Sequence, residues 1–283
     1  MSNQLTTQTA QVPSLKTFNQ KIVQEPKTQE YLQQVLGAKK DSFVNNLVAL
    51  VANNKKLQEC EPMGLMYSAV KATALGLPID SNLGFAYFIP YKNNRLGITE
   101  AQFQIGYKGF VQLAIRSGQY KTINVTDIRE GEIKKKNLLT GEIEFEEIED
   151  RINKLIVGYV AYIELNNGFN KLLYMTVEEL QQHAKKYSKT FNMSDSKWKT
   201  DFDAMAKKTV LKLLISKFGV MSIEMQNAVK YDQAVIRDED GTPTYVDNGS
   251  IVEDVQAEII EEQGKEIINI DVEQDSAQTV APF

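Results

Sequence analysis

The stretch AQFQIGYKGFVQLAIRSGQY, residues 101–120, decides the expected fold because its residue pattern changes from one secondary structure to another. Residues 101–106 alternate in polarity, which is typical of a strand. From Tyr107 to Ser117 the apolar side chains return at helical spacing, and Gly118 is suited to end that helix. The stretch therefore predicts a strand that leads directly into a helix.

Basic and amide side chains of this stretch are expected to lie together. Lys108, Gln112 and Arg116 are spaced four residues apart, so they line one face of the predicted helix. Gln104 lies on the preceding strand, and Tyr107 lies at the junction. This arrangement suits a phosphate backbone, and a solvated helix face is the alternative.

Two glycines flank the junction between the strand and the helix. Gly106 and Gly109 would let a backbone approach closely, because glycine has no side chain. The first turn of the helix also offers N–H groups without an acceptor in the helix, which can bind an anion. The glycines therefore add to the hypothesis of phosphate binding.

The rest of the pattern runs from helices, through strands with the one inserted helix, to helices again. Thr176 and Glu179 have the spacing of a capping box. The order predicts an α+β fold with a mostly antiparallel sheet, flanked by N-terminal helices. The expected helices cover 27–37, 42–54, the segment from Pro62 to Gly76, 107–117, the segment after Thr176, 200–218 and 222–229; the expected strands cover 84–91, 101–106, 120–128, 154–165 and 170–175, with a hairpin over 131–147.

Charge is distributed unevenly between the expected domain and its ends. Residues 1–26 are polar and are expected to form a flexible arm, and 27–231 are expected to form one domain. Residues 232–283 hold 14 acidic and two basic residues, a net charge of −12, whereas residues 1–231 hold 30 basic and 23 acidic residues. A basic body with an acidic, disordered tail suggests a polyanion partner. A soluble domain with a solvating tail is the alternative. The tail could also dock a partner through a small helix in IVEDVQAEII, or mimic DNA and compete with it.

A second group of basic residues surrounds the only tryptophan. Cations with an aromatic ring among them suit a single strand, because charge follows the backbone and a ring stacks on a base. Trp198 could equally anchor the core. The candidate DNA-binding residues of this group are Lys185, Lys186, Lys197, Trp198, Lys199, Lys207, Lys208 and Lys212.

Several other chemistries find little support. No phosphate-binding loop of the G-x-x-x-x-G-K-[ST] type occurs. Cys60 and His183 are the only cysteine and histidine, which excludes an internal disulfide and the usual zinc sites. A nucleophilic pair of the two is the alternative to structural roles, and the carboxylates of 142–150 could bind metal as in a nuclease or form an exposed hairpin. With no apolar run long enough for a membrane helix, we expect a cytoplasmic protein.

Three blocks in a fixed order resemble the RecT family of phage recombinases, relatives in function of the lambda Red beta annealing protein. They are MYSAVKATALGLPIDSNLGFAYFIPY (66–91), QFQIGYKGFVQLAIRSGQ (102–119) and SKWKTDFDAMAKKTVLKLL (196–214). The resemblance spans roughly residues 40–230 and extends to members from Gram-positive prophages. The acidic tail lies outside it.

The resemblance implies a protein without a catalytic role that anneals complementary single strands for phage homologous recombination. It implies no cofactor, neither ATP nor magnesium for chemistry. The expected partners are single-stranded DNA, the annealed duplex and further copies of the chain in a ring or helical filament. A phage exonuclease and the host single-strand DNA-binding protein are expected to engage the C-terminal tail. The family fold implies a sheet and a long helix that form a DNA groove. A metal-dependent nuclease and a structural, self-assembling phage protein remain the rivals.

Overall fold

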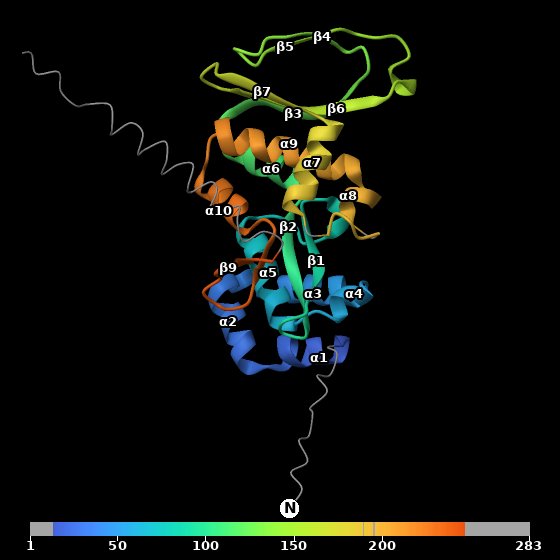
Figure 1. Ribbon diagram of the computed structural model, residues 1–283. Helices are drawn as coiled ribbons and strands as arrows, with labels where there is room; N and C mark the ends of the chain where they lie inside the picture. Colours follow the sequence, from blue (N-terminus) through green and yellow to red (C-terminus); the bar gives the residue numbers. More distant parts are fainter. Residues whose placement is uncertain (1–13, 189, 195, 247–283) are drawn as a thin grey trace, which may run out of the picture. The chain divides into compact units, whose positions relative to one another are not determined.

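The computed structural model describes residues 14–188, 190–194 and 196–246 (Figure 1). Helices form its N-terminal part, and two of the longer ones begin with proline, whose missing N–H has no acceptor to lose at that position. Phe18, Ile22, Leu32 and Leu65 are buried among these helices. They are α1 (Leu15–Asn19), the π-helical turn η1 (Gln20–Gln24), α2 (Pro26–Leu36), η2 (Gly37–Lys39), α3 (Lys40–Ala52), α4 (Lys55–Gln58) and α5 (Pro62–Ala74).

A four-stranded antiparallel sheet lies against α5, in the strand order β1-β2-β8-β9. Its first two strands form a hairpin in which Ala86 pairs with Ile105, after the short turn η3 (Ser81–Leu83). Gln102 then pairs with Val235, so a segment distant in sequence completes the sheet. The strands are β1 (Ala86–Asn93), β2 (Ile98–Ile105), β8 (Ala234–Ile236) and β9 (Pro243–Tyr245).

A second antiparallel sheet has the order β3-β6-β7 and packs on the long helix α9 (Phe202–Phe218). A separate two-stranded hairpin arches over the other face of this sheet (Figure 1). The strands are β3 (Tyr120–Arg129), β6 (Ile156–Leu165) and β7 (Asn170–Thr176), and the hairpin holds β4 (Ile133–Lys136) and β5 (Ile143–Phe145), followed by η4 (Arg151–Asn153). The remaining helices are α6 (Tyr107–Arg116), α7 (Val177–Tyr187), α8 (Lys197–Thr200) and α10 (Ile223–Tyr231).

The expected α+β class, with antiparallel strands and one inserted helix, is confirmed. The capping box of Thr176 and Glu179 is formed, and Gly118 follows α6 with a φ of +67°. The strands, however, are divided among three sheets in the part of the chain that the structure describes. Strand periodicity shows which residues share a face, but it carries no information on which strands become neighbours.

Gly106 and Gly109 are needed for packing of the chain against itself. A Cβ atom at Gly106 would lie 2.2 Å from the carbonyl oxygen of Gly84, and one at Gly109 would lie 2.4 Å from that of Phe85. The N–H of Gly106 donates to Phe85 O at 3.0 Å. The close approach predicted for a ligand backbone is therefore made by residues 84–85, just before β1.

The folded region is longer at both ends than the expected domain. Residues of α1 and η1 are helical, and Phe18 and Ile22 among them are buried, where a flexible arm was predicted. At the other end, Asp232 is buried and β8 and β9 complete a sheet where an acidic tail was predicted to begin. Residues 1–13 and 247–283 lie outside the described part, so the predictions for them stay predictions.

An ion pair fastens this C-terminal segment to the sheet. Glu100 on β2 is 3% exposed and accepts hydrogen bonds from Arg237 at 2.6 and 3.0 Å, and from Asn93 at 2.8 Å. Burial alone would raise the pKa of the Glu100 carboxyl, but the hydrogen bonds from Arg237 and Asn93 hold that pKa below its ordinary value. Removal of Arg237 would leave a buried carboxylate without its cation.

These contacts predict where the chain can be shortened. A chain that ends after Asp247 should unfold at the same urea concentration as the full chain. A chain that ends after Tyr231 loses Asp232, β8 and Arg237, and removal of one partner from a buried ion pair costs about 3–5 kcal/mol. We expect this shorter chain to lack a cooperative unfolding transition, measured by circular dichroism. Equal stability of the two truncated chains would contradict the packing described here.

Candidate nucleic-acid interface

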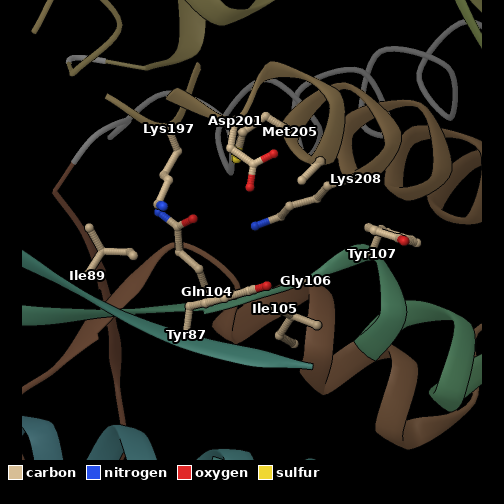
Figure 2. Close-up of a pocket in the computed structure, with 11 residues that line it drawn as sticks. Tyr87, Ile89, Gln104, Ile105, Gly106, Tyr107, Lys197, Asp201, Met205 and Lys208 are labelled. Atoms are coloured by element: carbon tan, nitrogen blue, oxygen red, sulfur yellow. The ribbon is translucent and has the colours of Figure 1, made fainter. Parts of the chain in front are cut away.

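A narrow cleft lies between the β1–β2 hairpin and the helices α8 and α9 (Figure 2). Its cavity measures about 60 Å³, room for only a few water molecules. One wall comes from β1, β2 and the start of α6, and the other comes from α8, the residue that follows it and α9. The lining residues are Tyr87, Ile89, Gln104, Ile105, Gly106 and Tyr107 on the first wall, and Lys197, Asp201, Ala204, Met205 and Lys208 on the second.

Four of the predicted DNA-binding residues meet in this cleft. Gln104 and Tyr107 come from the stretch 101–120, whereas Lys197 and Lys208 come from the second basic group. Figure 2 shows Gln104 and Lys197 close together on one side, with the Lys208 side chain reaching in from α9. The fold therefore brings two segments about 90 residues apart in sequence to one site.

A chain of amide groups holds Gln104 in place. Gln104 Nε2 donates to Gln102 Oε1 at 2.8 Å, and Gln102 Nε2 donates to the backbone oxygen of Gln233 at 2.9 Å. Gln102 is 2% exposed, so this relay runs through the interior of the sheet. Because its amide is already held by Gln102, Gln104 would lose little side-chain freedom on contact with a ligand.

The predicted row on α6 is present on the surface beside the cleft. Lys108, Gln112 and Arg116 are all exposed, as their spacing requires. Lys108 lies against Gly84, where a Cβ atom would be 3.4 Å from its Cδ. Arg116 donates from Nη2 to Leu75 O at 2.6 Å and from Nη1 to Gly76 O at 3.1 Å, so it satisfies carbonyl groups at the end of α5. Part of its hydrogen-bonding capacity is therefore used within the chain.

Lys208 does not extend into solvent as the sequence suggested. Its side chain is 7% exposed, and its Nζ lies 2.8 Å from Asp232 Oδ1, while Lys212 Nζ lies 2.6 Å from Asp232 Oδ2. Burial would raise the pKa of the Asp232 carboxyl, but the two ammonium groups hold that pKa below its ordinary value. Asp232 Oδ1 also accepts the N–H of Ile105 at 2.9 Å. The positive charge of Lys208 is thus held in the wall of the cleft.

Trp198 is an anchor of the core. It is 7% exposed, and its ring packs edge-on against Phe202 with 5.7 Å between the ring centroids. The alternative role, stacking on a base, would need an accessible ring face, so Trp198 is removed from the candidate set. The residues next to Trp198 offered no sign of this, because Lys197 and Lys199 are both exposed.

Four further predicted lysines do not line the cleft. Lys185 and Lys186 are exposed on α7. Lys199 Nζ donates to Asn192 O at 2.8 Å, and Lys207 Nζ lies 2.8 Å from Asp203 Oδ2. Their part in DNA binding stays a prediction, and for Lys199 and Lys207 it would compete with these contacts.

Neither nucleophilic nor metal chemistry finds a site in the part of the chain that the structure describes. Burial, and then the charges of Glu59 and Glu61, raise the pKa of the Cys60 thiol to about 12, so the thiol is protonated at neutral pH. Burial and the nearby Lys212 and Lys186 lower the pKa of His183 to about 4. No group of three potential metal ligands is found among the described residues, those of 142–150 included.

Two charged residues of the site were missed by sequence reasoning: Asp201, which lines the cleft, and Asp232, which pairs with Lys208 behind the wall. Asp232 was assigned to the tail because it opens the acidic segment, and its role depends on lysines that lie 20 and 24 residues before it. A lone acidic residue between two apolar segments, ahead of the run AVI of β8, is the one signal that could have singled it out.

The RecT family model matches residues 41–247, which contain both walls of the cleft. The chain belongs to the RecT family. It is 42% identical over 208 residues to the "Uncharacterized protein YqaK" of Bacillus subtilis (strain 168), covering 74% of this chain and 69% of that protein. It is 31% identical over 186 residues to "Protein RecT" of Escherichia coli (strain K12), covering 62% of this chain and 65% of that protein.

Membership of the RecT family makes this chain a DNA-binding protein of recombination by single-strand annealing. The region that matches the family model ends at residue 247, sixteen residues beyond residue 231, the predicted end of the domain. Among the described residues, no helix has the length and apolar character needed to cross a membrane.

The burial of Trp198 can be tested by fluorescence, because it is the only tryptophan. We expect blue-shifted emission in the folded protein, and little quenching by iodide, since a buried indole is out of the ion's reach. Addition of an oligothymidylate should leave the emission unchanged. Unfolding in urea should expose Trp198 and allow iodide to quench its emission. Strong quenching of the folded protein by the oligonucleotide alone would show that the ring stacks on bases.

Proposed function

We propose that this RecT family protein anneals complementary DNA strands without ATP by holding their backbones along the cleft between β1–β2 and α8–α9. The observation that carries this proposal is the convergence of Gln104, Tyr107, Lys197 and Lys208 on one cavity. Two of the blocks that resemble the RecT family, 102–119 and 196–214, contribute polar and basic residues to its opposite walls. Lys108 and Gln112 extend the polar surface along α6.

The dimensions of the cleft favour contacts with the DNA backbone. A cavity of about 60 Å³ has room for only a few water molecules, which favours contacts at its mouth over insertion of a base. Phosphates at its mouth, in contrast, could reach the exposed ammonium groups of Lys197 and Lys108 and the amide of Gln104. Contacts of this kind carry no sequence information, so pairing between the two strands would supply the specificity. This is the behaviour that an annealing protein needs.

Assembly is a further part of the proposed function. Single-stranded DNA and the annealed duplex would both lie along successive copies of the chain, in a ring or helical filament. Neutralisation of the phosphates by each copy would lower the repulsion between the strands. A phage exonuclease and the host single-strand DNA-binding protein are proposed to engage the C-terminal tail, which lies outside the described residues.

The double variant K108E/K197E tests the cleft. We expect it to fold but to anneal two complementary oligonucleotides at least about tenfold more slowly, because both charges that face the proposed phosphates are reversed. The matched control is K134E/K135E, with the same charge change on β4, away from the cleft. Annealing is followed by gel electrophoresis with EDTA and without nucleotide. Equal rates for the two double variants would place the DNA elsewhere.

Salt dependence gives a separate test of backbone binding. The affinity for single strands should fall by about 0.7 log unit per tenfold increase in salt for each phosphate contacted. The control oligonucleotides differ in sequence but not in length, and they should give the same slope. A flat response, or an annealing reaction that requires ATP or Mg²⁺, would refute the proposed function.

A further inference from the structure

We infer that Asp232 is an exchangeable counter-ion for the DNA phosphate: it holds Lys208 while the cleft is empty, and Lys208 leaves it for a phosphate when DNA binds. This inference rests on the proposed function of the cleft. It assigns a positioning role to a residue outside the cleft lining, behind the wall that α9 forms.

The position of Lys208 suits such an exchange. Its side chain lines the cleft and reaches into the space between Asp201 and Gln104 (Figure 2). Its Nζ makes a 2.8 Å contact with Asp232 Oδ1. An ammonium group has three donors, so a phosphate at the cleft could first share Lys208 with Asp232 and then take it over by a rotation of its flexible stem.

The second lysine makes this exchange possible. When Lys208 leaves, Asp232 keeps Lys212 Nζ at 2.6 Å and the N–H of Ile105 at 2.9 Å. When a fully buried carboxylate loses its only cation, the folded protein is strongly destabilised. A pair of one carboxylate and one lysine could therefore not release the lysine. Two lysines on one carboxylate avoid this penalty, because one of them always remains.

The charge of the group favours a phosphate as the incoming ligand. Lys208 and Lys212 carry two positive charges against one negative charge on Asp232, so the group has a net charge of +1. Burial of Lys208 and Asp232 limits screening by solvent and salt, and Lys212 is only partly exposed. The exposed Lys197 adds to the positive potential of the cleft, and Asp201, which lines the same cavity, opposes it.

A purely structural role for this group leads to a different expectation. In that case Lys208 stays on Asp232 whether or not DNA is bound, and the three residues only fasten α9 to β2. Removal of Asp232 would then lower stability without strengthening DNA binding. The exchange, in contrast, predicts that DNA binds more tightly when it no longer competes with Asp232 for Lys208.

The decisive variant is D232N/K212M, which keeps the net charge of the group at +1. The side-chain amide oxygen that D232N introduces can still accept the N–H of Ile105, and Lys208 loses the carboxylate with which it pairs. We expect the affinity for a fluorescent oligothymidylate to rise about tenfold, as the loss of one charge-assisted competitor suggests. Fluorescence anisotropy measures the affinity at several salt concentrations. A folded double variant that binds no more tightly than the wild type overturns the inference.

A second variant decides the question if D232N/K212M does not fold. K208M keeps Asp232 paired with Lys212, and methionine replaces the stem of the lysine. The exchange predicts that its salt slope for single strands is lower than that of the wild type by about 0.7 log unit, the value for one phosphate. K217M, the same change at an exposed position of α9, should keep the wild-type slope. An unchanged slope in K208M overturns the inference.

The wild-type chain separates this inference from the proposed function. If the wild type does not bind single strands or anneal them, the proposed function fails. If it binds and anneals but the two variants behave as the structural role predicts, only the exchange at Asp232 fails.

Discussion

One buried carboxylate determines how the two walls of the cleft are held together. Asp232 has no exposed side-chain surface, so each of its oxygens must keep a partner inside the protein. Lys208 and Lys212 lie one turn apart on α9, and the N–H of Ile105 lies at the end of β2. Because these three groups meet on one side chain, α9 cannot move relative to β2 without breaking a charged contact. The strand–helix junction and the long helix are thus fixed with respect to each other.

A second constraint places the junction itself. The backbone of residues 84–85 passes so close to Gly106 and Gly109 that no side chain fits at either position. This contact fixes the start of β1, and with it Tyr87, against the N-terminal turn of α6. Tyr87 and Tyr107 therefore lie on the same wall as Gln104, whose amide is oriented through Gln102. Backbone packing on one wall and a buried ion pair behind the other together give a cleft with little freedom of shape.

The sequence was sufficient for the local structure and for part of the site. Alternation and helical spacing predicted the longer strands and helices between β1 and α10, but not the short helix α8. Spacing alone placed Lys108, Gln112 and Arg116 on one exposed face. The errors concern tertiary contacts. Lys208 and Trp198 each have polar residues directly before and after them in the sequence. Their burial is shown only by the contacts of Lys208 with Asp232 and of Trp198 with Phe202. The end of the domain was misplaced for the same reason, since the acidic composition after Tyr231 conceals a strand that completes a distant sheet.

The distribution of charge between the surface and the interior affects how an annealing protein could bind DNA and still release it. Lysines on the surface, such as Lys108 and Lys197, are screened by salt and already solvated, so in the proposed function they would attract a strand and release it readily. A cation that is buried and unpaired would bind a phosphate more strongly, but it would lower the stability of the fold. A group of two lysines that share Asp232 lies between these extremes. Its net charge is +1, and at least one lysine is paired with the carboxylate at all times. Binding of intermediate strength would suit the proposed function, in which a bound single strand must remain able to adjust its register until it has paired with its complement.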